Sequence, residues 1–323
     1  MMYRRLAIMV FFVLASTGAQ AQPRMARVAV LTPEMGRPQS QAVKGLRDEF
    51  KQLGYQEGKQ ISFEMQNAKG DRGHLQPMAA DVVSRKVDAI LTTGTRAAQA
   101  AKSATRDIPI VLIHPSNPIL LGLVNSAENP GANVTGVAGF SGQRTEQRLA
   151  ILKEIIPQLE RVHIFYDSND RYSRGNFAIA KAAADKLNVE VVEHGVKSAE
   201  ELKATVSGVQ IKKGDALFHI SDDLVESDAD LIFDTARKKK LPTMFNEETW
   251  AVRGAMAAYG PNYYEMGRQA ARLVEMIIKG RKPESLPIQR ANKFEFILNY
   301  RTANFIGVTL APDLLKRADK VIR

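Results

Sequence analysis

Cysteine is absent from all 323 residues of the chain. Disulfides, thiol catalysis and thiolate metal sites are therefore excluded, and the fold must be stabilised by a large hydrophobic core. The five histidines show no close pair with the spacing of metal ligands. We expect neither a metal nor a cofactor.

The apolar run near the start, Leu6–Ala15, is much shorter than the roughly 20 residues that a transmembrane helix needs. It follows Arg4 and Arg5 and precedes the small-x-small pattern Ala19–Ala21. These features are typical of a cleaved export signal over residues 1–21. We expect a mature chain that begins near Gln22 and lies in the periplasm of a cell with two membranes.

The signatures of common enzymes are missing. The sequence has no Gly-x-Ser-x-Gly elbow, no phosphate loop and no dinucleotide glycine fingerprint. The stretch GFSGQ (139–143) has its serine one position short of the elbow. We expect a binding protein rather than an enzyme, with an exported hydrolase as the weaker alternative.

Positive charge is in excess but spread along the chain. Without Arg4 and Arg5, the formal charge of +10 falls by two to +8. The densest basic run, Arg237–Lys240, closes a predicted helix, where cations suit the helix dipole. We therefore expect no nucleic-acid partner.

Short apolar runs alternate with longer amphipathic stretches along the chain. Because the runs are continuous rather than alternating, they indicate parallel strands that are buried on both faces. The pattern occurs twice, which predicts an α/β fold of two doubly wound, Rossmann-like parallel-sheet domains. The expected strands are Val28–Leu31, Ile61–Met65, Ala89–Thr92, Ile110–Ile113, Val162–Tyr166, Val189–Val192, Ala216–Ile220, Thr243–Phe245 and Ala255–Tyr259.

The amphipathic stretches predict the helices that cover these sheets. Between the two halves, Asn133–Gly142 is rich in glycine and small polar residues and is interpreted as a hinge. The expected helices are Gln39–Leu53, Leu75–Lys86, Arg96–Ala104, a short one around Leu120–Ser126, Asn176–Leu187, one that opens at Ser198, Leu224–Lys239 and Tyr264–Lys279.

Polar residues follow the carboxyl end of nearly every predicted strand, where open parallel sheets bind their ligands. In Thr93-Gly94-Thr95, the glycine lets the backbone approach a ligand, Thr95 can cap the following helix, and both hydroxyls can donate to a carboxylate. Any one of these loops also fits an ordinary helix cap. Together they favour a ligand cleft between the two halves. The candidate ligand-binding residues are Thr32, Thr93, Gly94, Thr95, Ser116, Asn117, Phe140, Ser141, Asp167, Asn169, Asp222, Asn246, Glu247 and Tyr259.

Five stretches carry a resemblance to a known family: 50–64, 92–112, 117–137, 259–289 and 293–322. Three motifs are specific in combination, namely the Thr-Gly-Thr element, the run GLV…NPGANVTG (122–136) and the closing LLKRADKVI (314–322). The mature chain resembles the ABC-transporter substrate-binding proteins of the periplasmic binding type I class, in the group of tryptophan- and tyrosine-binding TrpX-like proteins. Asn117 stands where that family often has an acid.

The resemblance implies a function. The protein would capture a small solute, an amino acid or a related carboxylate, by closing two domains around it, and would deliver it to an ABC permease. A ligand sensor for a membrane receptor is the alternative. The domains would comprise residues 27–139 with 262–292 and 140–261 with 293–323, and the protein would act as a monomer. Because Asn117 is uncharged, we expect Asp167, Asp222 or Glu247 to pair with the ligand's ammonium group.

The export signal yields the first prediction. Mass spectrometry of the protein recovered from an expressing two-membrane cell should show an N-terminus at or near Gln22, in the soluble extracytoplasmic fraction. An uncut N-terminus in the membrane fraction would contradict the interpretation.

Overall fold

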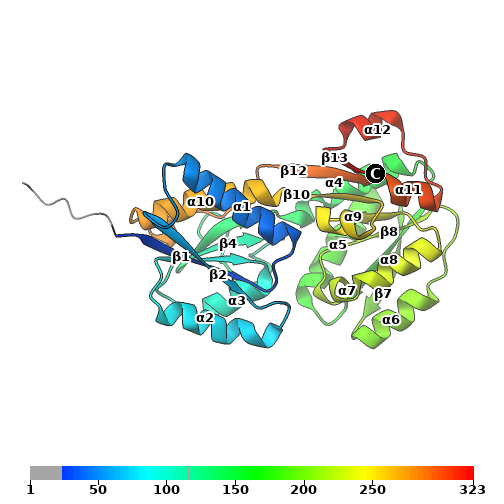
Figure 1. The fold of residues 1–323 in the computed structure, drawn as a ribbon. Coiled ribbons are helices and arrows are strands. Elements are labelled where there is room, and N and C mark those ends of the chain that lie inside the picture. The colour runs from blue at the N-terminus through cyan, green and yellow to red at the C-terminus, as the bar shows by residue number, and fades with distance from the viewer. Residues whose placement is uncertain (1–23, 115) are drawn as a thin grey trace, which may run out of the picture.

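The computed structural model describes residues 24–114 and 116–323, with the backbone alone described at Arg72, Ser141, Gln143 and Asp223. The expected export signal lies outside these residues. The chain forms two lobes that lie side by side, each built on one sheet with helices on both faces (Figure 1). Within the described ranges, no helix combines the length and apolarity needed to cross a membrane.

The first lobe contains a six-stranded sheet in the order β2-β1-β3-β4-β5-β11, and all of its recorded pairings are parallel. Helices α1 (Arg37–Gln52) and α10 (Tyr263–Ile278) cover one face, and α2 (Leu75–Ser84) and α3 (Thr95–Ala104) cover the other (Figure 1). The strands are β1 (Ala26–Thr32), β2 (Ile61–Asn67), β3 (Ala89–Thr93), β4 (Ile110–His114), β5 (Val134–Ala138) and β11 (Gln289–Arg290).

The second lobe contains a seven-stranded sheet in the order β7-β6-β8-β9-β10-β12-β13. It is parallel except where β12 runs antiparallel to β10. The strands are β6 (Arg161–Asp167), β7 (Glu190–Val196), β8 (Asp215–Phe218), β9 (Thr243–Phe245), β10 (Ala257–Pro261), β12 (Phe294–Asn299) and β13 (Lys320–Ile322).

The helices of the second lobe divide between the two faces of its sheet. One core cluster joins α4 (Thr145–Ile155), α5 (Arg171–Lys186), α11 (Tyr300–Ile306) and α12 (Pro312–Arg317) to the strands. The opposite cluster is formed by α6 (Ala199–Gly208), α7 (Asp223–Ser227), α8 (Ala229–Lys238) and α9 (Glu248–Arg253). Three short 3-10 turns complete the described elements: η1 (Arg72–His74), η2 (Ser141–Arg144) and η3 (Pro283–Ser285).

Burial on both faces explains the continuous apolar runs of the sequence. In β1, Val28 and Val30 point into the core under α1 and α10, whereas Ala29 and Leu31 point into the core over α2 and α3. All four side chains are fully buried. Because successive side chains of a strand alternate between faces, a strand covered on both sides must be apolar throughout.

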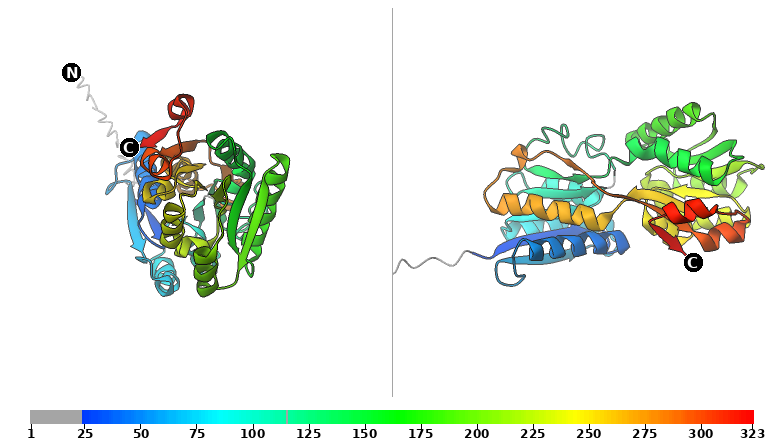
Figure 2. Two further views of the ribbon diagram at one scale, coloured as in Figure 1. Left: turned by 90° about the vertical axis from the view of Figure 1, so that its right-hand side faces the viewer. Right: turned by 90° about the horizontal axis from the view of Figure 1, so that it is seen from above.

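The chain passes between the two sheets three times: after β5, through the segment from β10 to α10, and between β11 and β12 (Figure 2). On this allocation of strands we propose lobe boundaries near 139/140, 261/262 and 292/293. The predicted hinge over Asn133–Gly142 needs correction, because Val134–Ala138 of that stretch is strand β5 of the first sheet.

Two of the predicted helices are wrong in detail. The stretch Leu120–Ser126 forms turns rather than a helix, and Gly122 has a left-handed φ of 66° that ends regular structure there. The single helix expected over Leu224–Lys239 is broken into α7 and α8 at Asp228, whose carbonyl accepts the amides of Leu231 and Ile232.

Helices α1 and α10, about 220 residues apart in sequence, pack with their backbones in close contact. Two glycines permit this approach. A Cβ built on Gly45 would lie 1.9 Å from the Tyr264 carbonyl oxygen, and one built on Gly267 would lie 2.0 Å from the Ala42 carbonyl oxygen. Since backbone atoms cannot move aside as a side chain would, any larger residue must push the helices apart.

Gly267→Ala should therefore lower the free energy of unfolding by about 1–3 kcal/mol, as overpacked sites usually do. The matched control is Gly175→Ala in α5, where nothing lies within 4 Å of the added methyl group. That change should be neutral or stabilising, because alanine favours helix over glycine by up to about 1 kcal/mol. If urea denaturation gave the same change in the free energy of unfolding for both variants, the close approach of the helices would not contribute to stability.

Candidate functional site

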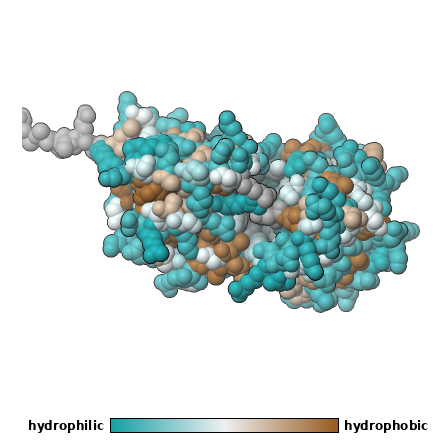
Figure 3. Space-filling view, turned by 90° about the horizontal axis from the view of Figure 1, so that it is seen from below, coloured by the Kyte–Doolittle hydropathy of each residue, from teal (hydrophilic) through white to brown (hydrophobic). Residues whose placement is uncertain are grey.

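The carboxyl ends of the parallel strands in both lobes face the interface between the lobes. Ser116 follows β4 in the first lobe, and its Oγ donates to Oγ of Ser221, which follows β8 in the second lobe, at 3.2 Å. A space-filling view shows the surface hollowed between the lobes on the face seen from below (Figure 3). The side chains around this contact make up the interlobe cluster: Thr95, His114, Ser116, Tyr172, Ser221, Asn246 and Glu247.

In the first lobe, Thr32 and Thr93 stand at the ends of neighbouring strands β1 and β3 and are buried. The Thr93 hydroxyl donates to Oγ1 of Thr32 at 2.8 Å, and the Thr32 hydroxyl donates to the Glu34 carbonyl oxygen. Each hydroxyl proton therefore already has an acceptor within the lobe. The two residues fix the conformation of the strand ends, and toward a ligand their hydroxyl oxygens can act only as hydrogen-bond acceptors.

Thr95 and Ser116 are organised by His114, a residue with 3% exposure that closes β4. Nδ1 of His114 accepts the Ser116 amide at 2.9 Å, which leaves the proton on Nε2. Nε2 lies 2.7 Å from the Thr95 hydroxyl and donates to it. The hydroxyl proton of Thr95 can then donate elsewhere, toward an anion at the start of α3.

The expected capping role of Thr95 is wrong. Gly94 stands at the cap position of α3, with φ 84° and ψ 167°, and no side chain caps this helix. A residue with a Cβ is strained at that φ, which accounts for the glycine between the two threonines. With Thr95 in the first turn, the helix presents its leading amides next to the interlobe contact, an arrangement that favours anions.

The other first-lobe candidates serve the loops or the connection between the lobes. Asn117 is half-buried, and its Oδ1 accepts the Ile119 amide at 3.0 Å. Phe140 is buried with a left-handed φ of 47°, and the Arg290 guanidinium lies 4.7 Å from its ring centre. Ser141 opens η2, and its side chain lies outside the described part of the structure.

Two second-lobe candidates, Asp222 and Asp167, have carboxylates that accept backbone amides. The buried carboxylate of Asp222 accepts the Val225 amide at 2.8 Å and the Asp167 amide at 2.7 Å. Asp167 accepts the Asn169 amide at 2.8 Å, and Asn169 itself is exposed. Tyr259 lies in β10, where its ring stacks on Phe294 at 5.8 Å. The carboxylates of Asp167 and Asp222 therefore both already accept hydrogen bonds from backbone amides.

Asn246 follows β9 and has 1% exposure. Its amide nitrogen donates to the Ser221 hydroxyl at 2.7 Å, whereas its Oδ1 is buried and has no hydrogen-bond partner among the described residues. An unsatisfied buried carbonyl is costly, so this oxygen is well suited to accept a hydrogen bond from a ligand. Ser221 thus joins Asn246 to Ser116 across the interface.

Glu247, directly after Asn246, is the acid that fits a cationic ligand. Its side chain caps no helix, and no cation pairs with it in the described part of the chain. Burial, together with the nearby Glu226 carboxylate, raises the pKa of its carboxyl to about 8, while a hydrogen bond with the Tyr263 hydroxyl acts in the opposite direction. At neutral pH the ligand-free site therefore holds Glu247 mainly as the neutral acid.

The sequence pattern did not single out Tyr172, which belongs to the interlobe cluster, or Glu226, which lies beside it. The Tyr172 hydroxyl is buried. Burial raises its pKa, and the nearby side chains of Ser116 and Asn176 act in the opposite direction. Nε2 of His219 lies 3.3 Å from Oε1 of Glu226. Both Tyr172 and Glu226 lie in the opening turns of helices that follow strand ends, which is the signal that would have found them.

A charged contact also joins the lobes outside this cluster. The Arg37 guanidinium, at the start of α1, lies 2.9 Å from the Glu248 carboxylate at the start of α9. Glu248 also pairs with Lys320 of its own lobe. Within the described ranges, no group of three acidic or imidazole side chains is arranged to hold a metal ion.

The comparisons with known proteins identify the family. The family model described as "ABC transporter substrate binding protein" matches residues 27–322. The chain belongs to this family. The predicted family and class of function are thereby confirmed: such substrate-binding proteins act outside the cytoplasm, bind small molecules and serve ABC permeases.

This substrate-binding protein is 30% identical over 285 residues to the tyrosine-binding protein of Clostridioides difficile, covering 88% of this chain and 81% of that relative. A conserved domain protein from Vibrio cholerae matches with 29% identity and a TM-score of 0.81, over 92% of this chain and 100% of that one. An ABC domain in complex with L-Trp from Streptococcus pneumonia matches with 24% identity and a TM-score of 0.80, over the same shares. The predicted fold class is confirmed by these structures.

The ion pair between the lobes generates a prediction about closure. Arg37→Gln removes the pair but leaves Glu248 with Lys320, so the open form should gain population and the radius of gyration in small-angle scattering should rise. Ligand affinity should fall by up to about fivefold, the upper end for an exposed pair. The control is Arg47→Gln on the same helix, whose partner Glu57 lies in the same lobe. Identical scattering from both variants would contradict a role for this pair in closure.

Proposed function

We propose that this protein is the periplasmic binding component of an ABC importer for an aromatic amino acid, with tyrosine as the first candidate. The name of the 30% identical tyrosine-binding relative supports this choice. The observation that carries it is Glu247, a half-buried carboxylate at the interface that has no cationic partner in the described residues. An amino acid would bring that cation.

In the proposed complex, the ligand's ammonium group pairs with Glu247 and donates to the unsatisfied Oδ1 of Asn246. The ligand's carboxylate lies at the start of α3, with the Thr95 hydroxyl donating from the side. The second lobe therefore supplies negative charge and the first lobe supplies hydrogen-bond donors. Because each end of the ligand needs a different lobe, binding favours the closed form.

Of the three acids expected to pair with the ammonium, Glu247 alone is retained in this proposal. Asp222 already accepts two amides and Asp167 accepts one. Turning the Asp222 carboxylate toward a ligand would leave the amides of Val225 and Asp167 unsatisfied, and turning that of Asp167 would release the exposed amide of Asn169. The remaining candidate residues shape the loops around the site rather than touch the ligand directly.

The same site argues against catalysis. Its histidine, His114, is held between the Thr95 hydroxyl and the Ser116 amide. Both ring nitrogens are used to orient these groups, so the ring does not act as a base that activates a nucleophile. We propose a monomeric carrier without enzymatic activity, delivering its ligand to a permease. A sensor that signals through a membrane receptor would use the same closure, and transport assays in a strain lacking the permease separate these two roles.

Glu247→Gln should weaken the binding of L-tyrosine at least tenfold in calorimetry, because one member of a buried charge pair is lost. The wild-type protein should likewise bind 3-(4-hydroxyphenyl)propionate, which lacks the amino group, at least tenfold more weakly than L-tyrosine. That analogue should lose little further affinity in the variant.

Asp167→Asn is the matched control, since it removes a carboxylate at a neighbouring strand end and should change affinity by less than about twofold. Undiminished binding of L-tyrosine by Glu247→Gln would remove Glu247 from the site. Failure of every aromatic amino acid to bind the wild-type protein would instead overturn the proposed ligand.

A further inference from the structure

A second pocket lies in the second lobe, between helices α8 and α11. Its volume is about 260 Å³. Thr243, which lines it, begins β9, whereas Asn246 follows the other end of that strand. The pocket therefore lies at the opposite end of the sheet from the interlobe cluster, and the two share no residue.

The walls of the pocket are apolar. Phe233, Leu241 and Ile306 line the pocket and are nearly fully buried. Phe305 stands at the rim with 59% of its surface exposed, the largest exposure among the big hydrophobic side chains recorded as exposed. A phenylalanine left in solvent at the mouth of an apolar hollow gains burial when an apolar group enters.

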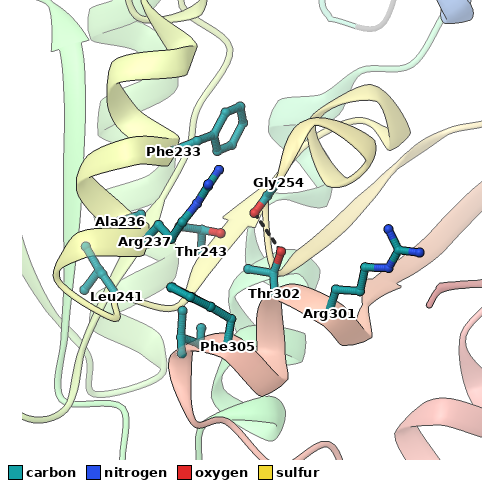
Figure 4. Close-up of a pocket in the computed structure, with 10 residues that line it drawn as sticks. Phe233, Ala236, Arg237, Leu241, Thr243, Gly254, Arg301, Thr302 and Phe305 are labelled. Carbon is teal, nitrogen blue, oxygen red and sulfur yellow. Dashed lines mark hydrogen bonds between the residues drawn. The ribbon is translucent and has the colours of Figure 1, made fainter.

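The two charged side chains that line the pocket, Arg237 and Arg301, are cationic. Figure 4 shows the Arg237 side chain reaching between Phe233 and Gly254, with Arg301 turned away from the group. The nearest recorded anion to Arg237 is Asp234, at 3.9 Å on an exposed helix face. The hydroxyl of Thr243 accepts the Met256 amide at 2.8 Å and retains its own proton to donate.

A cation at the end of α8 also suits the helix dipole, as the sequence indicated. The dipole does not explain the hollow in front of the guanidinium or the exposed ring of Phe305. A ligand with both an anionic group and a compact apolar group accounts for all three features. A carboxylate can accept two parallel hydrogen bonds from a guanidinium, which gives the pairing a defined geometry.

We propose that this pocket, here named the α8–α11 pocket, binds a small aryl or branched-alkyl carboxylate through Arg237, with the apolar group between Phe233 and Phe305. The volume suits one ring-sized group rather than a whole drug-sized ligand. Such a site would let the second lobe sense an organic acid independently of the solute held between the lobes.

Methyl-detected NMR with phenylacetate tests the proposal on the full mature chain. Phenylacetate should produce saturable shifts of the Leu241 and Ile306 methyl groups. Arg237→Gln should weaken this binding by about fivefold, near the upper end for an exposed ion pair. Phe305→Ala should weaken it as well, whereas phenylacetamide, which has the same shape without the charge, should bind as weakly as phenylacetate does to Arg237→Gln.

The matched control is Lys238→Gln, since Lys238 is the next residue of α8, is exposed and does not line the pocket. It should leave the phenylacetate titration unchanged. Shifts confined to the Thr95 methyl group would place phenylacetate between the lobes and overturn the proposal. So would Leu241 and Ile306 shifts that are equal in the wild type and in Arg237→Gln.

Discussion

Glu247 is half-buried at the interface between the two lobes, and this position controls the protonation of the site. A carboxylate removed from water without a cation costs several kcal/mol when ionised, so it takes up a proton instead. Its neighbour Glu226 is also acidic, which adds repulsion rather than relief. The closed form without ligand is thus either protonated at Glu247 or electrostatically unfavourable.

This constraint links ligand binding, closure and pH. The pKa of Glu247 is raised from an ordinary 4.5 to about 8 in the folded protein. Between those values the folded protein holds a proton that the unfolded chain releases. Its contribution to stability is therefore greatest below about pH 4.5 and is lost as the pH rises through 8. An ammonium ligand stabilises the ionised form, so its binding at neutral pH should expel the proton.

The sequence located most strands closely because burial on both faces leaves a continuous apolar run, as in β1 and β3. It could not show which of the three acids already holds backbone amides, because each was judged from its place after a strand. Asp222 is occupied by the amide of Asp167, which lies 55 residues away and is brought near by the pairing of β6 with β8. Whether a carboxylate meets such an amide depends on the register of the strands, which local sequence does not encode.

The same limit applies to the first lobe. Thr95 looked like a helix cap because threonines commonly are, yet His114 from the next strand holds its hydroxyl. The pattern of strand ends did not point to Tyr172 and Glu226, because they lie in the first turn of helices rather than in the preceding loops. Reading the first helical turn together with the strand end would have included both.

The central claim is that Glu247 exchanges a proton for the ligand's ammonium group. Calorimetric titration of L-tyrosine at pH 7, repeated in buffers of different ionisation enthalpy, counts the protons released on binding. The account predicts release of up to about one proton per ligand by the wild-type protein and none by Glu247→Gln. Binding that releases no proton, or the same release from both proteins, would contradict it.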